Sequence, residues 1–168
     1  MLAGIRERQG RVEEAIALLR SRQSVAGGGR EPLADLLARH GRVEELRAYA
    51  EVSPLVEVTR CLSELLEARG DLDGAIEVYR EAPNASVAFE VNSAAELSQL
   101  LQRHGRAGEA LEVIRMLAES PHGDDWSIHL ACVMYLEQDR AGEGLAFLDA
   151  CEARHPDAWW DFSHCVWR

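Results

Sequence analysis

The chain of 168 residues is 47% hydrophobic and 28% charged with 5 prolines, proportions that exclude a disordered polymer and predict one folded domain over residues 1–168. Its net charge of -11, from 18 arginines against 29 acidic residues, repels phosphates, so nucleic acid and anionic membrane surfaces are disfavoured as partners. The sequence has no apolar run of the roughly 18 residues that a membrane span needs, and residues 1–6 lack the apolar block of a signal peptide, so we expect a cytoplasmic protein.

The predicted elements recur along the chain as helical hairpins. Apolar residues at helical spacing precede and follow a short turn in each of five units, which predicts two helices per unit and about ten or eleven in all. The turn residues, spaced 31, 29, 35 and 34 apart, are Gly10, Gly41, Gly70, Gly105 and Asp139. Glycine suits the left-handed position that ends a helix, and aspartate tolerates that position next best.

Small residues recur where the two helices of a unit must approach closely. Seven residues before the turns stand Ala3, Ala34, Ser63, Ser98 and Cys132. Five residues after the turns stand Ala15, Leu46, Ala75, Ala110 and Gly144. Nine of these ten residues are small, which predicts interlocked helices with Ala75 and Ala110 buried at the contact.

The boundaries between units carry helix-stop and helix-start signals. The second helices are predicted to end near residues 27–29, 53–54, 83–84, 120–121 and 155–156, where glycine or proline occurs. Ser53 is predicted to cap the helix that follows, and the segment from Ser93 to Glu96 fits a capping box at a helix start. His40 and His104 precede turn glycines, where an imidazole can cap the last carbonyls of a helix.

These units resemble the tetratricopeptide repeat, whose first helix carries a large and a small residue, whose turn is of Gly-Asp type, and whose second helix has an early alanine. The best match comprises Leu62, Ser63, Leu66, Gly70, Asp71, Ala75, Ile76, Tyr79 and Ala82. The resemblance implies a right-handed α-solenoid of about five stacked hairpins. The complete lack of lysine resembles the codon bias of a GC-rich genome, such as an actinobacterial one. The residues of the units are similar to those of repeat proteins of actinobacteria, which implies a bacterial source.

The resemblance also implies a function, since tetratricopeptide-like proteins receive a peptide on the concave face formed by their first helices. The corresponding residues here are Glu31, Asp35, Glu57, Arg60, Glu64, Glu67, Asn92, Gln99, Gln102, Trp126 and His129. Residues 61–168 carry a net charge of -12 against +1 for residues 1–60, so a basic or polar peptide is the expected partner. The lysines of the family's clamp for a C-terminal carboxylate are missing, which disfavours a chaperone-tail adaptor.

Catalytic and metal motifs are not evident in the sequence, so we expect no enzyme activity, no cofactor and no metal. Most acidic residues fall in first turns of predicted helices, where they complement the helix dipole. Four widely spaced cysteines predict reduced, buried thiols rather than a disulfide framework. The two weak metal candidates are the cluster of Cys151, His155, His164 and Cys165, and the pair His122 and Asp124, which a helix cap explains more simply.

Three classes of protein remain open. The first is a protein-interaction module or scaffold, the second is an oligomerising structural or regulatory domain such as the sensor of a bacterial regulator, and the third is an accessory domain of a larger enzyme. Neither end of the repeat array has an obvious polar cap. The chain is therefore expected to be part of a longer array, to form a homo-oligomer through its termini, or to be capped by its own tryptophan-rich tail.

Overall fold

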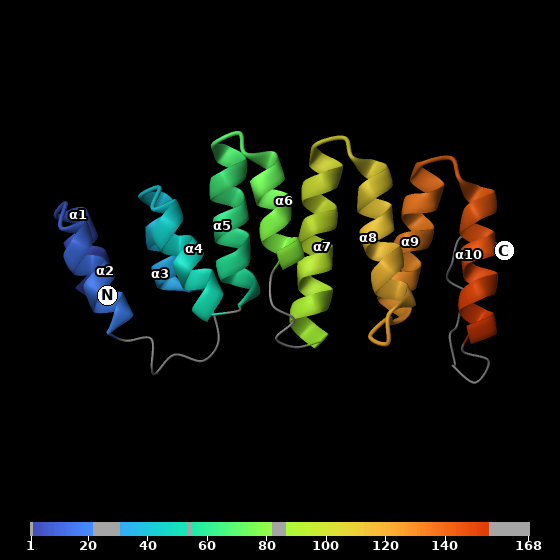
Figure 1. The fold of residues 1–168 in the computed structure, drawn as a ribbon, viewed down its shortest axis with the longest axis horizontal. Helices are drawn as coiled ribbons and strands as arrows, with labels where there is room; N and C mark the ends of the chain where they lie inside the picture. Colours follow the sequence, from blue (N-terminus) through green and yellow to red (C-terminus); the bar gives the residue numbers. More distant parts are fainter. Residues whose placement is uncertain (1, 22–30, 54, 82–86, 155–168) are drawn as a thin grey trace. The chain divides into compact units, whose positions relative to one another are not determined.

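The computed structural model describes residues 2–21, 31–53, 55–81 and 87–154, and within these ranges it is all-α, with ten helices and no strand (Figure 1). The helices form five hairpins in chain order. They are α1 (Leu2–Arg8) with α2 (Val12–Arg20), α3 (Pro32–Arg39) with α4 (Val43–Val52), α5 (Val56–Ala68) with α6 (Leu72–Glu81), α7 (Val87–Arg103) with α8 (Ala107–Glu119), and α9 (Asp125–Glu137) with α10 (Ala141–Arg154). The all-α fold and the five helical hairpins are as predicted.

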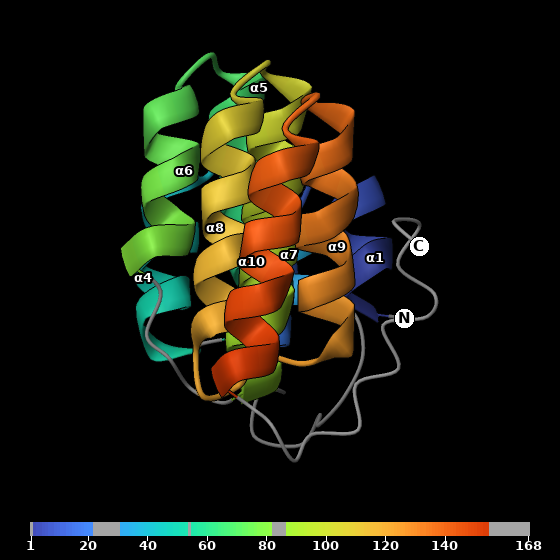
Figure 2. The same ribbon diagram turned by 90° about the vertical axis from the view of Figure 1, so that its right-hand side faces the viewer.

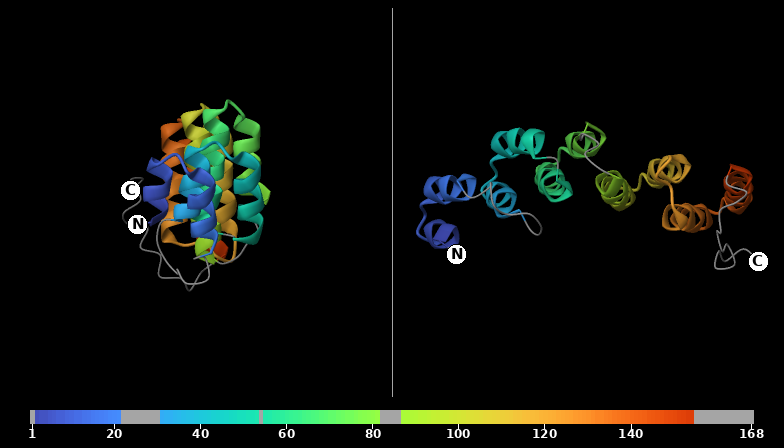
Figure 3. Two further views of the ribbon diagram at one scale, coloured as in Figure 1. Left: turned by 90° about the vertical axis from the view of Figure 1, so that its left-hand side faces the viewer. Right: turned by 90° about the horizontal axis from the view of Figure 1, so that it is seen from below.

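The chain divides into two compact units, Met1–Ala85 and Ser86–Arg168, each of which we describe by itself. In the first unit α2 packs on α3, and α5 packs on α3, α4 and α6. Seen along the helices, α1, α3 and α5 form one row and α2, α4 and α6 another (Figure 3). In the second unit α8 packs on α7 and on α9, and α10, which is in front in Figure 2, packs on α9. Each unit is thus a stack of helical hairpins.

All five turns use one hydrogen-bonding arrangement. The turn residues have positive φ angles, between 64° and 81° for Gly10, Gly41, Gly70 and Gly105 and 55° for Asp139. In each turn the following residue donates its N–H five residues back, as from Arg106 to the Leu101 carbonyl at 2.9 Å, and the turn residue donates three residues back. This is the Schellman motif, which requires a left-handed residue and so explains the recurring glycine.

The helices of each hairpin interlock through the predicted small residues. Ala15, Ala34, Ala75 and Ala110 are completely buried, Ser63, Ser98 and Cys132 are nearly so, and Ala3 is the one partly exposed member of the set. Large apolar residues four positions before the turns fill the space beside them, with Leu37, Leu66, Leu101 and Tyr135 all buried. The predicted alternation of large and small residues therefore forms the core of the four later hairpins, whereas in the first one Arg6 stands at the large position and α1 has no buried residue.

Arginine precedes the second helix in four of the five hairpins. Arg11, Arg42, Arg106 and Arg140 each pair with the glutamate three residues on, at 2.6 Å between Arg11 Nε and Glu14 Oε1 and 2.8 Å between Arg140 Nε and Glu143 Oε1. A cation at a helix N-terminus is unfavourable, and the glutamate offsets it. In the remaining hairpin Asp71 accepts a 2.9 Å hydrogen bond from the N–H of Gly74 instead.

Polar contacts also join neighbouring hairpins of the first unit. Glu7 of α1 accepts hydrogen bonds of 3.0 and 2.9 Å from the guanidinium of Arg39, and His40 lies 3.1 Å from the same carboxylate. The guanidinium of Arg69 donates a 2.6 Å hydrogen bond to the carbonyl of Gly41. These contacts link each turn to the turn of the adjacent hairpin.

Three predicted local features differ in the structure. Ser93 does not cap a helix, because α7 begins six residues earlier at Val87 and Ser93 is buried inside it. Helix α5 is preceded by Leu55 rather than capped by Ser53, and its N-cap position has no side-chain hydrogen bond. The imidazole of His40 contacts Glu7 rather than the carbonyls of its own helix. A longer helix overrides the local pattern at Ser93, a tertiary contact overrides it at His40, and Ser53 instead ends α4, where its N–H bonds the carbonyl of Tyr49.

Candidate functional site

The first-unit part of the predicted site lies on α3 and α5 and on the residue before α3. Glu57 and Glu64 of α5 are exposed, and Arg60 and Glu67 are half-buried. Arg60 Nη1 donates a 2.7 Å hydrogen bond to Glu64 Oε1, so the carboxylate of Glu64 is paired with a cation of its own helix. Glu57 forms no ion pair with any described residue and is therefore available to a cationic ligand.

Two further acidic residues of this part bond to side chains of neighbouring helices. Glu31 accepts a 2.8 Å hydrogen bond from the hydroxyl of Tyr49 on α4. Asp35 accepts a weak one, 3.6 Å long, from the thiol of Cys61 on α5. Both carboxylates thus support the packing of α3 on its neighbours while keeping their negative charge at this surface.

The thiol of Cys61 is held in its protonated form. Burial, together with the negative charge of Asp35, raises the pKa of Cys61 to about 11. The Arg60 guanidinium opposes this shift but does not outweigh it. Because the thiolate is the nucleophilic and metal-binding form, Cys61 is a packing residue at neutral pH.

The second-unit part of the predicted site lies on α7 and α9. Asn92, Gln99 and Gln102 of α7 are exposed, as are Trp126, which is 44% exposed, and His129 on α9. The two helices meet below this surface, where the hydroxyl of Ser98 lies 4.0 Å from the sulfur of Met134. This part therefore presents amides and one aromatic ring rather than carboxylates.

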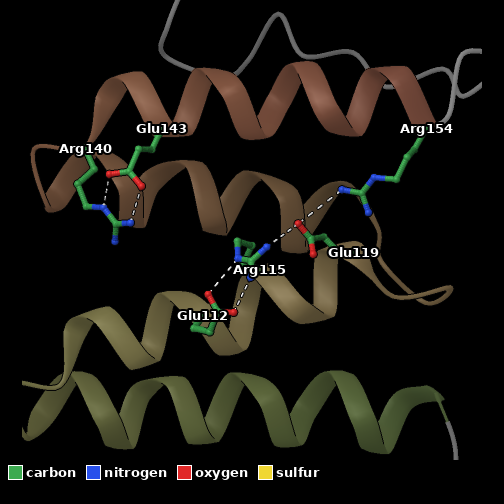
Figure 4. A network of polar contacts seen from close by, with 6 residues as sticks. All are labelled: Glu112, Arg115, Glu119, Arg140, Glu143 and Arg154. Atoms are coloured by element: carbon green, nitrogen blue, oxygen red, sulfur yellow. Dashed lines mark hydrogen bonds and ion pairs between the residues drawn. The ribbon is translucent and has the colours of Figure 1, made fainter.

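The acidic residues of the second unit lie largely elsewhere. Glu112 and Glu119 on α8 both bond to Arg115, at 3.0 Å to its Nε and 2.8 Å to its Nη1, and Arg154 at the end of α10 lies 3.7 Å from Glu119 (Figure 4). The Arg115 guanidinium lowers the pKa of the Glu112 carboxyl. The network ties α10 to α8, so these carboxylates serve the packing of the unit. Glu112, Arg115 and Glu119 are neighbours on one helix, whereas Arg154 comes from another helix and reaches them only in the folded chain, which sequence spacing could not predict.

The loop before α9 forms a helix cap. Asp124 Oδ1 accepts a 3.0 Å hydrogen bond from the N–H of Ser127, and the hydroxyl of Ser127 accepts one of 3.0 Å from the N–H of Asp124. Asp124 is therefore a helix-capping residue, as predicted. His122 lies 3.9 Å from Glu90 of α7.

Metal-binding clusters of three or more histidine, cysteine or acidic residues are absent from the described part of the chain. Of the candidate cluster at the C-terminus, Cys151 is a buried free thiol, whereas His155, His164 and Cys165 lie outside the described residues. Cys61 and Cys132 are likewise free and buried, as expected. Within the described ranges, none of the helices is both long enough and apolar enough to cross a membrane.

Comparison with known proteins gives a weak structural similarity only. No protein-family model and no curated protein matches the chain. Among solved structures, it is similar to a kinesin-light-chain-type protein of Podosopora anserina with nearly identical TPR-like repeats, at 19% identity over 94% of both chains and a TM-score of 0.43. A single-substitution variant of that protein matches at 18% identity, with the same coverage and TM-score. These values carry no inference about function, so the fold description depends on the hairpins themselves.

Proposed function

We propose that the chain is a non-catalytic module that binds a basic peptide segment of a partner protein on the exposed face of α3 and α5. The observation that carries this proposal is the charge of that face. It presents five carboxylates, from Glu31, Asp35, Glu57, Glu64 and Glu67, against two guanidiniums, those of Arg60 and of Arg39, which is bound to Glu7. Of these, Glu57 has no cationic partner among the described residues.

A cationic ligand relieves the repulsion within this face. Glu57 and Glu64 are seven residues apart on α5, so their side chains point from one side of the helix, and Glu67 follows Glu64 by three. An arginine or lysine of a bound peptide beside Glu57 gains a charge-assisted hydrogen bond to its carboxylate and is also attracted by the charges of Glu64 and Glu67. For the second unit by itself, we propose that Asn92, Gln99, Gln102, Trp126 and His129 contact the polar backbone and apolar side chains of a partner protein.

The test is a comparison of two double variants with the same change in net charge. Binding of arginine-rich and glutamate-rich peptides from a peptide array is measured for Glu57→Gln/Glu64→Gln and for the control Glu44→Gln/Glu77→Gln. The control residues are exposed glutamates of α4 and α6 with no described ion pair. We expect preference for basic peptides, affinity that falls as salt rises, and loss of affinity in the first variant only. Equal binding of acidic peptides, or indifference to both salt and substitution, contradicts the proposal.

Oligomerisation is a second candidate, favoured by the exposed apolar face of α1. None of the residues of α1 is buried, and Leu2 and Ile5 are 55% and 36% exposed. A second copy that covered this face would remove apolar area from water. Sedimentation equilibrium of the chain and of Leu2→Glu/Ile5→Glu tests it, since a monomer in both cases rules it out. The bacterial source is proposed from the sequence resemblance alone, and the cytoplasmic location stays a prediction from the sequence.

A further inference from the structure

A pocket of about 140 Å³ opens on the side of the first unit formed by α4, α5 and α6. Its floor consists of Ala50, Thr59, Leu62 and Val78, of which the last three are buried. The hydroxyl of Thr59 bonds to the carbonyl of Leu55, so it offers little polarity to the pocket. A cavity of about 150 Å³ with apolar walls accepts a group the size of benzene. The pocket therefore has room for one leucine-sized or phenyl side chain.

Three charged side chains surround this apolar floor. They are Arg47 and Glu51 of α4 and Glu81 at the end of α6. Although Arg47 and Glu51 are four residues apart on one helix, no ion pair joins them, in keeping with the less favourable order of cation before anion. Within the described ranges none of the three has an ion-pair partner, whereas Arg20, Arg39, Arg42 and Arg60 of the same unit all do.

The unpaired charges indicate the chemistry of an occupant. Two carboxylates and one guanidinium around an apolar floor favour a ligand with an apolar group and a cation beside it. Further apolar surface adjoins the pocket at the end of α4, where Val52, next to Glu51, is 79% exposed, and at Leu55, which is 40% exposed. Binding there would remove this surface from water and give the rim carboxylates a partner.

We propose that this pocket, which we call the α4–α6 pocket, is a second peptide-binding site that takes one leucine-sized side chain of a partner protein flanked by arginine or lysine. The apolar side chain rests on Ala50, Leu62 and Val78, and the flanking cation contacts Glu51 and Glu81. Arg47 donates to backbone carbonyls of the same peptide. The site is separate from the α3–α5 face and depends on different carboxylates, so each of the two sites can fail without the other.

The probe for this proposal is a twelve-residue peptide of glycine and serine with a central leucine between two arginines. Two matched peptides replace the leucine by glycine or both arginines by glutamate. Binding is followed by backbone amide chemical shifts of ¹⁵N-labelled protein. We expect the leucine–arginine peptide to shift the amides of Ala50, Leu62 and Val78, and both matched peptides to bind more weakly. Absence of shifts at these residues with millimolar probe, or equal shifts with the glycine peptide, overturns the proposal.

Charge-matched variants then separate this site from the α3–α5 face. Glu51→Gln/Glu81→Gln is expected to weaken binding at the α4–α6 pocket about fivefold, while Glu44→Gln/Glu77→Gln and Glu57→Gln/Glu64→Gln leave it unchanged. Ala50→Phe is expected to fill the pocket and abolish the shifts at Leu62 and Val78. An equal loss in all three charge variants would show non-specific attraction and overturn the assignment. The glutamine variants keep this test valid if Ala50→Phe does not fold.

Discussion

The hydroxyl of Ser63 donates a 3.1 Å hydrogen bond to the carbonyl oxygen of Ala75 across the interior of the α5–α6 hairpin. Ser63 stands seven residues before the turn and Ala75 five after it, so the two positions at which small residues recur are in direct contact. Neither position has room for a larger side chain, since Ala75 is completely buried and Ser63 is 2% exposed.

Replacing Ala75 or Ala110 with leucine is therefore expected to overpack the hairpin and lower the free energy of unfolding by about 1–3 kcal/mol. Urea denaturation followed by circular dichroism measures the change. Ala48→Leu on α4 and Ala146→Leu on α10 serve as controls, because both alanines are exposed helical residues. Unchanged urea midpoints for both buried alanines would show that the helices are not interlocked at these positions.

Gly105 in a turn and Gly108 in a helix should respond to alanine with opposite signs. A Cβ at Gly105 meets no atom within 4 Å, but its φ of 71° is strained for alanine, so Gly105→Ala is expected to cost about 1 kcal/mol. Gly108, three residues on, is in α8 with equally open space, so Gly108→Ala is expected to stabilise by about 0.5 kcal/mol. Asp139→Gly should also stabilise, because it relieves a positive φ. Thermal or urea unfolding of the three variants checks these signs, and destabilisation by Gly108→Ala would contradict them.

The tie between Glu7 and Arg39 should make stability depend on pH. The Arg39 hydrogen bonds, with a smaller contribution from His40, lower the pKa of Glu7 in the folded chain. A carboxyl with a depressed folded pKa stabilises the fold above its unfolded pKa, about 4.3, and loses that contribution as the pH falls through the folded value. We expect Glu7→Gln to lower the urea midpoint at pH 7, and we expect the difference from the unchanged protein to shrink as the pH falls through the lowered pKa of Glu7. If the difference in urea midpoint were as large at low pH as at pH 7, the substitution would act through packing and not through the ion pair.

The pattern of small and large residues was sufficient to predict the hairpins, because each hairpin is stabilised by contacts close in sequence. The recurring turn residue, glycine in four turns and Asp139 in the fifth, located all five turns for the same reason. The start of α7 was not predictable from the capping-box pattern at Ser93, because that pattern describes only four residues and a helix that begins earlier contains it unchanged. The α4–α6 pocket was also missed, since Ala50, Leu62 and Val78 come from three helices and meet only after packing.

The single domain expected over residues 1–168 stays a prediction, and the tryptophans offer a way to test it. All four tryptophans, at positions 126, 159, 160 and 167, belong to the second unit, whereas the helical circular dichroism signal comes from both units. If the repeats unfold as one domain, the fluorescence and circular dichroism transitions in urea should coincide. Separate midpoints would show that Met1–Ala85 and Ser86–Arg168 unfold independently.

The arginine–glutamate pair that begins four of the second helices has a consequence for how such a chain can grow. Each pair is contained within four consecutive residues, as in Arg106 and Glu109. A duplicated hairpin would therefore contain both the arginine before its second helix and the glutamate that offsets the arginine's charge. The tie from Glu7 to Arg39 differs, because its two members belong to different hairpins and would be lost when one hairpin is inserted between them. Gene duplication can therefore lengthen the array at little cost in local stability, while the order of hairpins is encoded in a few long-range contacts.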